Sequence, residues 1–195
     1  DEKGPLARAM RTLKREFGPA LAVIAEVCLC EYTDHGHCGM PDKGEVDNDG
    51  SLELLAKAAM AVAKAGADVV APMDMMDGRV GFIRDELDEA ELESTAILAG
   101  SALYDSAFWG TEAGRGADGG HGPDRGTYRL DAANAREALV EMLQDEEEGA
   151  DLLLVAPAGA CLDILRMARD EFDTTLVAWQ ADGECGAILA AAEKG

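Results

Sequence analysis

Short apolar segments alternate with amphipathic segments of helical period along almost the whole chain, and this alternation restricts the fold more than any other feature. Apolar runs that predict strands lie at 20–28, 68–72, 95–99, 151–155 and 175–180. Segments with helical spacing of apolar residues lie at 4–17, 51–65, 80–87, 131–148, 160–172 and 184–193. Strands that alternate with helices indicate βα units and a parallel sheet, so we expect an α/β fold.

The 195 residues fit a single domain, 1–195, that is long enough to bury a core. Periodicity alone leaves open whether the sheet is doubly wound or forms a barrel. The unusual residues follow the predicted strand ends, at 28–38, 74–77, 101–104, 156–161 and 180–185. In a (β/α)8 TIM barrel these ends form one rim, where active sites are built, so the barrel is favoured. A long glycine-rich loop at 106–127 is expected to be a lid or disordered.

A cluster of thiols follows the first predicted strand. Cys28 and Cys30 point to the same side of an extended backbone, and the loop after them allows Cys38 to fold back onto the pair. Three thiolates suit zinc, with a fourth position left for water or substrate. Three free thiols are the alternative, but the close spacing favours a metal. His35 and His37 are expected to form hydrogen bonds around the ligands rather than to bind the metal.

Charge and cysteine usage restrict the partners and the compartment. The net charge of -22 argues against nucleic acid and anionic membranes as partners. It is compatible with a high-salt adaptation and with an ordinary acidic surface, and the sequence favours neither. We find no apolar run of membrane-spanning length and no secretory leader pattern, and an odd number of cysteines suits the cytoplasm. Cys161 and Cys185 are expected to be small buried residues.

Longer motifs resemble one known family. They lie at 27–39, 44–49, 66–72, 74–80, 149–151 and 162–164 and include Asp74-Met75-Met76-Asp77-Gly78-Arg79-Val80. In this order they identify the chain as a divergent member of the porphobilinogen synthase (delta-aminolevulinic acid dehydratase) family. The resemblance implies a (β/α)8 barrel and zinc at the three cysteines. Matched by motif, the chain covers about five βα units, the family's third to seventh, so we expect a truncated, incomplete barrel with two open sheet edges.

The resemblance also implies a reaction, the condensation of two 5-aminolevulinate molecules through a lysine Schiff base with a second lysine nearby. Two adjacent amines depress each other's pKa and leave one of them nucleophilic. Here the two lysine positions are Ala156 and Leu103. Neither residue can form an imine, and losing covalent catalysis costs many orders of magnitude in rate. We therefore expect no catalytic residue for this reaction and no porphobilinogen synthase activity.

Groups that would bind the substrate have changed as well. Arg125 matches a family arginine that binds a carboxylate, whereas the family's loop arginine falls at Ala113, with Arg115 as a substitute two positions on. Asp182 stands where the family has a serine and would repel a substrate carboxylate. Three more family positions differ, at Glu26, Gly126 and Arg129.

Three hypotheses about function remain open. The first is a catalytically silent family member that binds zinc and a small acidic molecule. The second is a zinc enzyme with different chemistry, in which Asp74, Asp77 or Glu184 carries a proton, although three thiolates weaken the metal as a Lewis acid. The third is a regulatory module whose open sheet edges dock onto a homologous chain or a second copy. For Asp74 and Asp77 the alternative role is to cap the helix that begins near Gly78.

Overall fold

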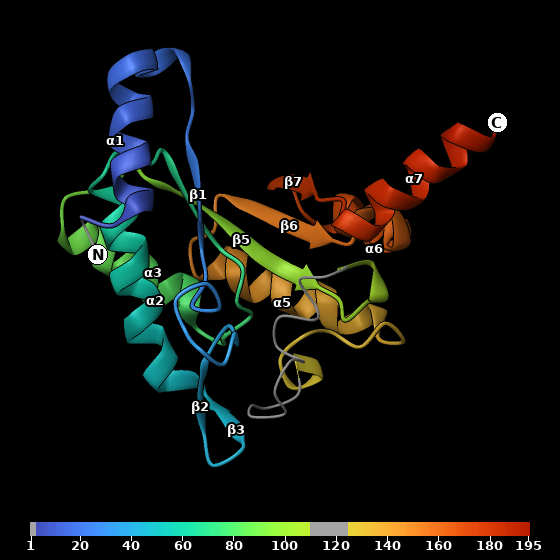
Figure 1. Ribbon diagram of the computed structural model, residues 1–195. Coiled ribbons are helices and arrows are strands. Elements are labelled where there is room, and N and C mark those ends of the chain that lie inside the picture. Colours follow the sequence, from blue (N-terminus) through green and yellow to red (C-terminus); the bar gives the residue numbers. More distant parts are fainter. Residues whose placement is uncertain (1–2, 110–124) are drawn as a thin grey trace.

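The computed structural model describes residues 3–109 and 125–195, whose centre is a five-stranded parallel sheet (Figure 1). Its strands are β1 (Ile24–Val27), β4 (Val69–Pro72), β5 (Ala96–Leu103), β6 (Leu152–Ala156) and β7 (Thr175–Ala178). They pair in the order β1-β4-β5-β6-β7, so the spatial order follows the chain. A doubly wound sheet reverses its strand order at a switch point. The order observed here is that of a (β/α)8 barrel, as predicted, with five of its strands.

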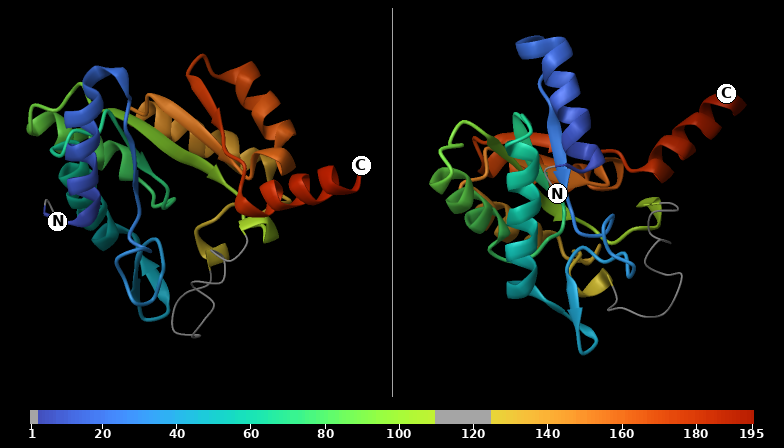
Figure 2. Two further views of the ribbon diagram at one scale, coloured as in Figure 1. Left: turned by 45° about the horizontal axis from the view of Figure 1, so that its top comes forward. Right: turned by 60° about the vertical axis from the view of Figure 1, so that its left-hand side comes forward.

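Helices cover one face of this sheet (Figures 1 and 2). These are α2 (Asn48–Ala63), α3 (Arg79–Glu89), α5 (Ala135–Glu147) and α6 (Leu162–Glu171). Around them lie α1 (Pro5–Phe17), the antiparallel hairpin of β2 (Met40–Asp42) and β3 (Glu45–Asp47), and α7 (Asp182–Lys194). Short 3-10 turns are η1 (Gly18–Ala20), η2 (Ala107–Trp109), η3 (Arg125–Thr127) and η4 (Ala158–Ala160). Helix α1 packs on α2, whereas α7 extends away from the body of the molecule.

The two faces of the sheet bury different sets of side chains, because successive residues of a strand point to opposite sides. Leu153 and Val155 of β6 belong to the large core that also contains the helices. Leu154 and Ala156 belong to a smaller apolar cluster on the other face, together with Trp109. In a closed barrel this second face is the interior.

Some predicted boundaries are wrong. The first strand begins at Ile24 rather than at residue 20, because Gly18–Ala20 form a 3-10 turn. It is not buried throughout, since β1 is an edge strand within the described residues and Ile24 is 57% exposed. The strand predicted at 95–99 continues to Leu103, with a register shift in its pairing to β6.

Helix α2 begins three residues before its predicted cap, Ser51. The cap is Asp47, whose carboxylate accepts a hydrogen bond from the Gly50 backbone N–H at 3.0 Å. Ser51 lies inside the helix and accepts a hydrogen bond from the backbone N–H of Met40 at 2.8 Å. It therefore ties the β2–β3 hairpin to the helix. In the described part of the chain, we find no helix with the length and apolarity to cross a membrane.

Candidate metal centre and its neighbouring cavity

The three cysteines of the loop after β1 come together. The sulfur atoms of Cys28 and Cys30 are 3.1 Å apart, and all three sulfurs, with that of Cys38, lie within 4.8 Å of one another. Cys28 and Cys38 are buried and Cys30 is partly exposed. The predicted convergence is present, but Cys30 lies in a turn closed by Tyr32 and Leu29 rather than on an extended strand.

The pKa values of the three thiols in this cluster are shifted in different directions. Hydrogen bonds from the thiols of Cys28 and Cys30 lower the pKa of Cys38 to about 3. The pKa of Cys28 is raised by its hydrogen bonds with Cys30 and Cys38 and by burial. The pKa of Cys30 is lowered by Cys28 but raised on balance by Cys38 and by burial. Cys38 is therefore the most acidic of the three thiols, and binding of a metal ion would require the sulfur ligands to be deprotonated.

The donor set fits a soft or borderline metal ion. Three sulfurs on one short loop can supply three corners of a tetrahedron, which leaves a fourth position open. Among the described residues, this is the one group of cysteine, histidine and acidic side chains close enough together to hold a metal ion. His35 and His37 are not part of that group, although they lie on the same loop.

A distant segment holds the cysteine loop. Arg125 Nη2 donates a hydrogen bond to the carbonyl oxygen of Gly36 at 2.6 Å. The Tyr128 hydroxyl lies 3.3 Å from His37 Nδ1, and the two rings meet edge to face with centroids 6.4 Å apart. His35 stacks on His37 at 5.7 Å, and burial is the main cause that lowers the pKa of His37. The loop is therefore fixed from outside by two side chains of one turn.

A cavity of about 90 Å³ adjoins the cysteines. Leu103, Trp109 and Trp179 form an apolar wall, and Arg125 and Arg129 are the cationic residues among its lining. The Arg129 guanidinium carbon lies 4.6 Å from the centroid of the Trp109 ring, and Trp109 packs edge to face on Trp179 at 5.9 Å. The Trp109 indole N–H donates to the Tyr104 carbonyl at 2.7 Å. Trp109 is therefore held in this wall by a hydrogen bond, a cation–π contact and an aromatic contact.

The two positions at which the resemblance predicts lysines lie next to each other. Leu103 of β5 pairs in register with Ala156 of β6. Their exposed fractions are 3% and 0%, and both belong to the apolar cluster with Trp109. Leu103 lines the cavity, and we find no lysine among the described residues that line it. The resemblance predicts lysine amines at these two positions, whereas this chain has the hydrocarbon side chains of Leu103 and Ala156 there.

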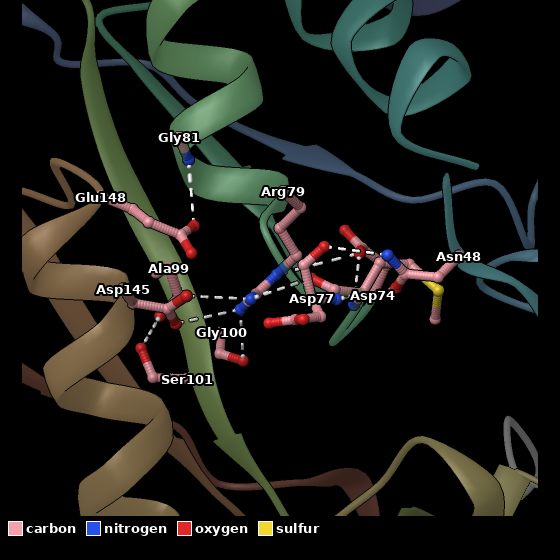
Figure 3. A network of polar contacts seen from close by, with 11 residues as sticks. Asn48, Asp74, Asp77, Arg79, Gly81, Ala99, Gly100, Ser101, Asp145 and Glu148 are labelled. Carbon is pink, nitrogen blue, oxygen red and sulfur yellow. Dashed lines mark hydrogen bonds and ion pairs between the residues drawn. The ribbon is translucent and has the colours of Figure 1, made fainter. Parts of the chain in front are cut away.

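Asp74, one of the proposed proton carriers, lies in a buried ionic network (Figure 3). Its Oδ1 accepts a hydrogen bond from the Met76 backbone N–H at 2.9 Å and lies 3.8 Å from Arg79 Nε. Burial raises the pKa of Asp74 to about 6, against the opposing charge of Arg79. Arg79 is bound more closely by Asp145, at 2.9 and 3.1 Å, and donates to the Gly100 carbonyl at 3.2 Å. The network joins β5 to α3 and α5.

The helix-capping alternative for Asp74 and Asp77 is wrong. Helix α3 is capped by Gly78 in the left-handed region, with φ of 76°, and has no side-chain capping bond. Asp77 instead exchanges backbone hydrogen bonds with the Asn48 side chain, at 2.8 and 3.0 Å. Neither aspartate lines the cavity beside the cysteines.

Glu184, the third proposed proton carrier, uses both carboxylate oxygens as acceptors. One accepts from the Gly159 backbone N–H at 2.6 Å and the other from that of Ala181 at 2.7 Å. It therefore pins η4, after β6, to the start of α7.

The remaining predicted residues have mixed outcomes. Asp182 is exposed at the start of α7, and Cys161 is buried as expected. Cys185 is exposed, contrary to the prediction, because α7 packs on little besides η2. Arg115, Ala113 and most of the predicted loop at 106–127 lie outside the described residues. Tyr128 was not singled out from sequence, because it stands 91 positions from His37 and no local motif connects them.

Comparison with known proteins gives a consistent result. The family model described as delta-aminolevulinic acid dehydratase matches residues 1–195. The delta-aminolevulinic acid dehydratase of Streptomyces coelicolor is 49% identical over all of this chain and 59% of its own length. That of Archaeoglobus fulgidus is 45% identical, over all of this chain and 60% of its own length.

A solved structure extends the similarity to the fold. It is the delta-aminolevulinic acid dehydratase (porphobilinogen synthase) of Toxoplasma gondii ME49 in complex with the reaction product porphobilinogen. The TM-score is 0.92 at 41% identity, over all of this chain and 56% of that chain. The chain therefore spans less than two thirds of the length of these relatives.

Proposed function

The chain belongs to the delta-aminolevulinic acid dehydratase family, and we propose that it is a zinc-binding member that does not condense 5-aminolevulinate. The observation that carries this proposal is the pairing of Leu103 with Ala156 beside a cavity that the three cysteines also line. The metal ligands are retained in this proposal, whereas the amine chemistry is lost.

The proposed loss of condensation activity follows from the groups that formation of an imine requires. A Schiff base forms when a neutral amine attacks a keto group, and the second amine of such a site helps to keep the first one neutral. A leucine and an alanine supply neither the nucleophile nor the charge. Both are buried in the apolar cluster that contains Trp109, and no lysine of the described residues lines the adjoining cavity.

We assign zinc to Cys28, Cys30 and Cys38, since three sulfur ligands with an open fourth position suit that ion. When bound, zinc would supply a Lewis-acidic centre whose strength the three thiolates reduce. None of the five cysteines, all of which lie within the described residues, forms a disulfide, and this supports a reducing, cytoplasmic location.

For the cavity we propose a small carboxylate as ligand. Arg125 lines it, and its Nε is buried with no hydrogen-bond partner in the described part of the chain. A carboxylate would satisfy this donor. Arg115 remains part of this proposal from the sequence alone.

The zinc-enzyme hypothesis has less support, because Asp74 and Glu184 are engaged in the fold and Asp77 lies away from the cavity. The docking hypothesis is supported by the free edges of β1 and β7 within the described residues. A homologous chain or a second copy is the partner it would predict.

The test combines a metal assay with a covalent trap. Purified protein is reduced, loaded with zinc and incubated with saturating 5-aminolevulinate, and porphobilinogen is measured beside the Streptomyces coelicolor relative as a positive control. Borohydride is then added, and the intact mass is recorded. We expect about one zinc per chain, no porphobilinogen above the blank and no added mass. Turnover or a reduced imine adduct on this chain would contradict the proposal.

A further inference from the structure

Two side chains of a single turn contact the cysteine loop from outside. Arg125 and Tyr128 stand on and directly after η3, 89 and 91 positions from the loop residues that they contact. The Arg125 guanidinium binds the Gly36 carbonyl, and the Tyr128 hydroxyl meets His37, the residue before Cys38. The loop is therefore held on the side of its third cysteine, which is the one that must fold back onto the other two.

The position of Cys38 depends on this support. Cys28 directly follows β1, so the sheet fixes the first sulfur, and Cys30 lies in the adjoining turn. Between Cys30 and Cys38 the described chain forms no strand or helix. Contacts at Gly36 and His37 restrain the part of the loop that regular structure leaves undetermined.

The charge of the metal-loaded cysteines is a second reason to assign Arg125 a role in this centre. Three thiolates and one divalent cation carry a net charge of -1, which is costly to bury in a protein of net charge -22. The Arg125 guanidinium is near enough to act electrostatically on both Cys30 and Cys38. One guanidinium would neutralise the loaded centre.

We propose that Arg125 and Tyr128 are positioning residues of the metal centre, which hold the loop in the geometry for metal binding while Arg125 balances the charge of the three thiolates. This inference rests on the proposed zinc function. It gives Arg125 a role that does not need a substrate, and this role remains when Leu103 and Ala156 replace the amines.

The test is the zinc affinity of matched variants of the full chain, measured in reducing buffer by competition with a chromophoric chelator. Arg125→Gln removes the charge but keeps a donor, Arg125→Lys keeps the charge but shortens the reach, and Tyr128→Phe removes one oxygen. Arg166→Gln is the control, because Arg166 is exposed and pairs with Asp170 on its own helix, away from the cysteine loop. Cobalt(II) absorption of each variant reports the sulfur-ligand geometry independently.

Outer-shell partners of metal ligands are commonly worth about 10–100-fold in affinity, so we expect a loss of that order for Arg125→Gln and smaller losses for Arg125→Lys and Tyr128→Phe. Arg166→Gln should stay within about twofold of the parent protein. The cobalt ligand-field bands should broaden or shift in Arg125→Gln and not in the control.

Different failures have different meanings. If the parent protein binds no zinc, the proposed function fails. If the parent binds zinc and both Arg125→Gln and Tyr128→Phe match Arg166→Gln, the positioning role is wrong and the zinc site stands. If circular dichroism shows that Arg125→Gln does not fold, the zinc affinities of Arg125→Lys and Tyr128→Phe are compared with that of Arg166→Gln instead. If both match it, the positioning role is wrong.

Discussion

Leu103 of β5 and Ala156 of β6 are register partners, so they lie side by side on neighbouring parallel strands. The Tyr104 backbone N–H donates to the Ala156 carbonyl at 3.0 Å, which locks the two strands together at this point. Two amines placed here would be near enough to depress each other's pKa. The leucine and alanine side chains found here instead complete an apolar cluster with Trp109.

Ala156→Lys should therefore destabilise the protein rather than simply restore a nucleophile. Ala156 has an exposed fraction of 0% and belongs to the apolar cluster with Trp109, so a longer, charged side chain would have to enter buried apolar surroundings. Overpacking costs about 1–3 kcal/mol, and a buried ammonium adds to that cost. Urea unfolding measures the change, with Ala190→Lys on the exposed face of α7 as the control. Equal stability of the two variants would show that the site is not sealed.

Cys38→Ser should abolish stoichiometric zinc binding. A serine hydroxyl is a poor replacement for thiolate, and losing one of three ligands should exceed the about 10–100-fold effect of losing an outer-shell partner. Cys185→Ser is the matched control, since Cys185 is exposed on α7 and lies outside the cluster. Zinc per chain is measured after dialysis in reducing buffer. Equal metal content in both variants would remove Cys38 from the ligand set.

Local patterns predicted the fold better than they predicted the surroundings of the site. The alternation of apolar runs and helical segments is a local signal, and it identified the parallel sheet. The end of β5 was missed, because pairing with β6 carries the strand past Gly100, where local preference favours a break. The cysteines were found from their short spacing. Arg125 and Tyr128 could not be placed on the loop, because only tertiary packing brings them there.

The buried pair of Arg79 and Asp145 should be among the costliest to break. Asp145→Ala removes the carboxylate that pairs most closely with the buried Arg79 guanidinium, and among the described residues it leaves Asp74, at 3.8 Å, as the remaining ion-pair partner. Removing one partner of a buried ion pair costs about 3–5 kcal/mol. Asp170→Ala breaks the exposed pair with Arg166 and should cost at most about 1 kcal/mol. Urea unfolding of both variants compares the two costs, and similar values would contradict the structural role of the Arg79 network.

Asp74 should make stability depend on pH in mildly acidic solution. Its pKa is raised from 3.8 to about 6 in the folded chain, so between these values the folded state keeps a proton that the unfolded state has released. Stability therefore falls as pH rises through this window, by up to about 3 kcal/mol for a shift of about two pKa units. Asp74→Asn keeps an oxygen that can accept from Met76 and cannot titrate. Unfolding free energies at pH 4 and pH 6 should show that the parent loses stability relative to this variant as pH rises. Parallel pH curves would mean that Asp74 stays ionised beside Arg79.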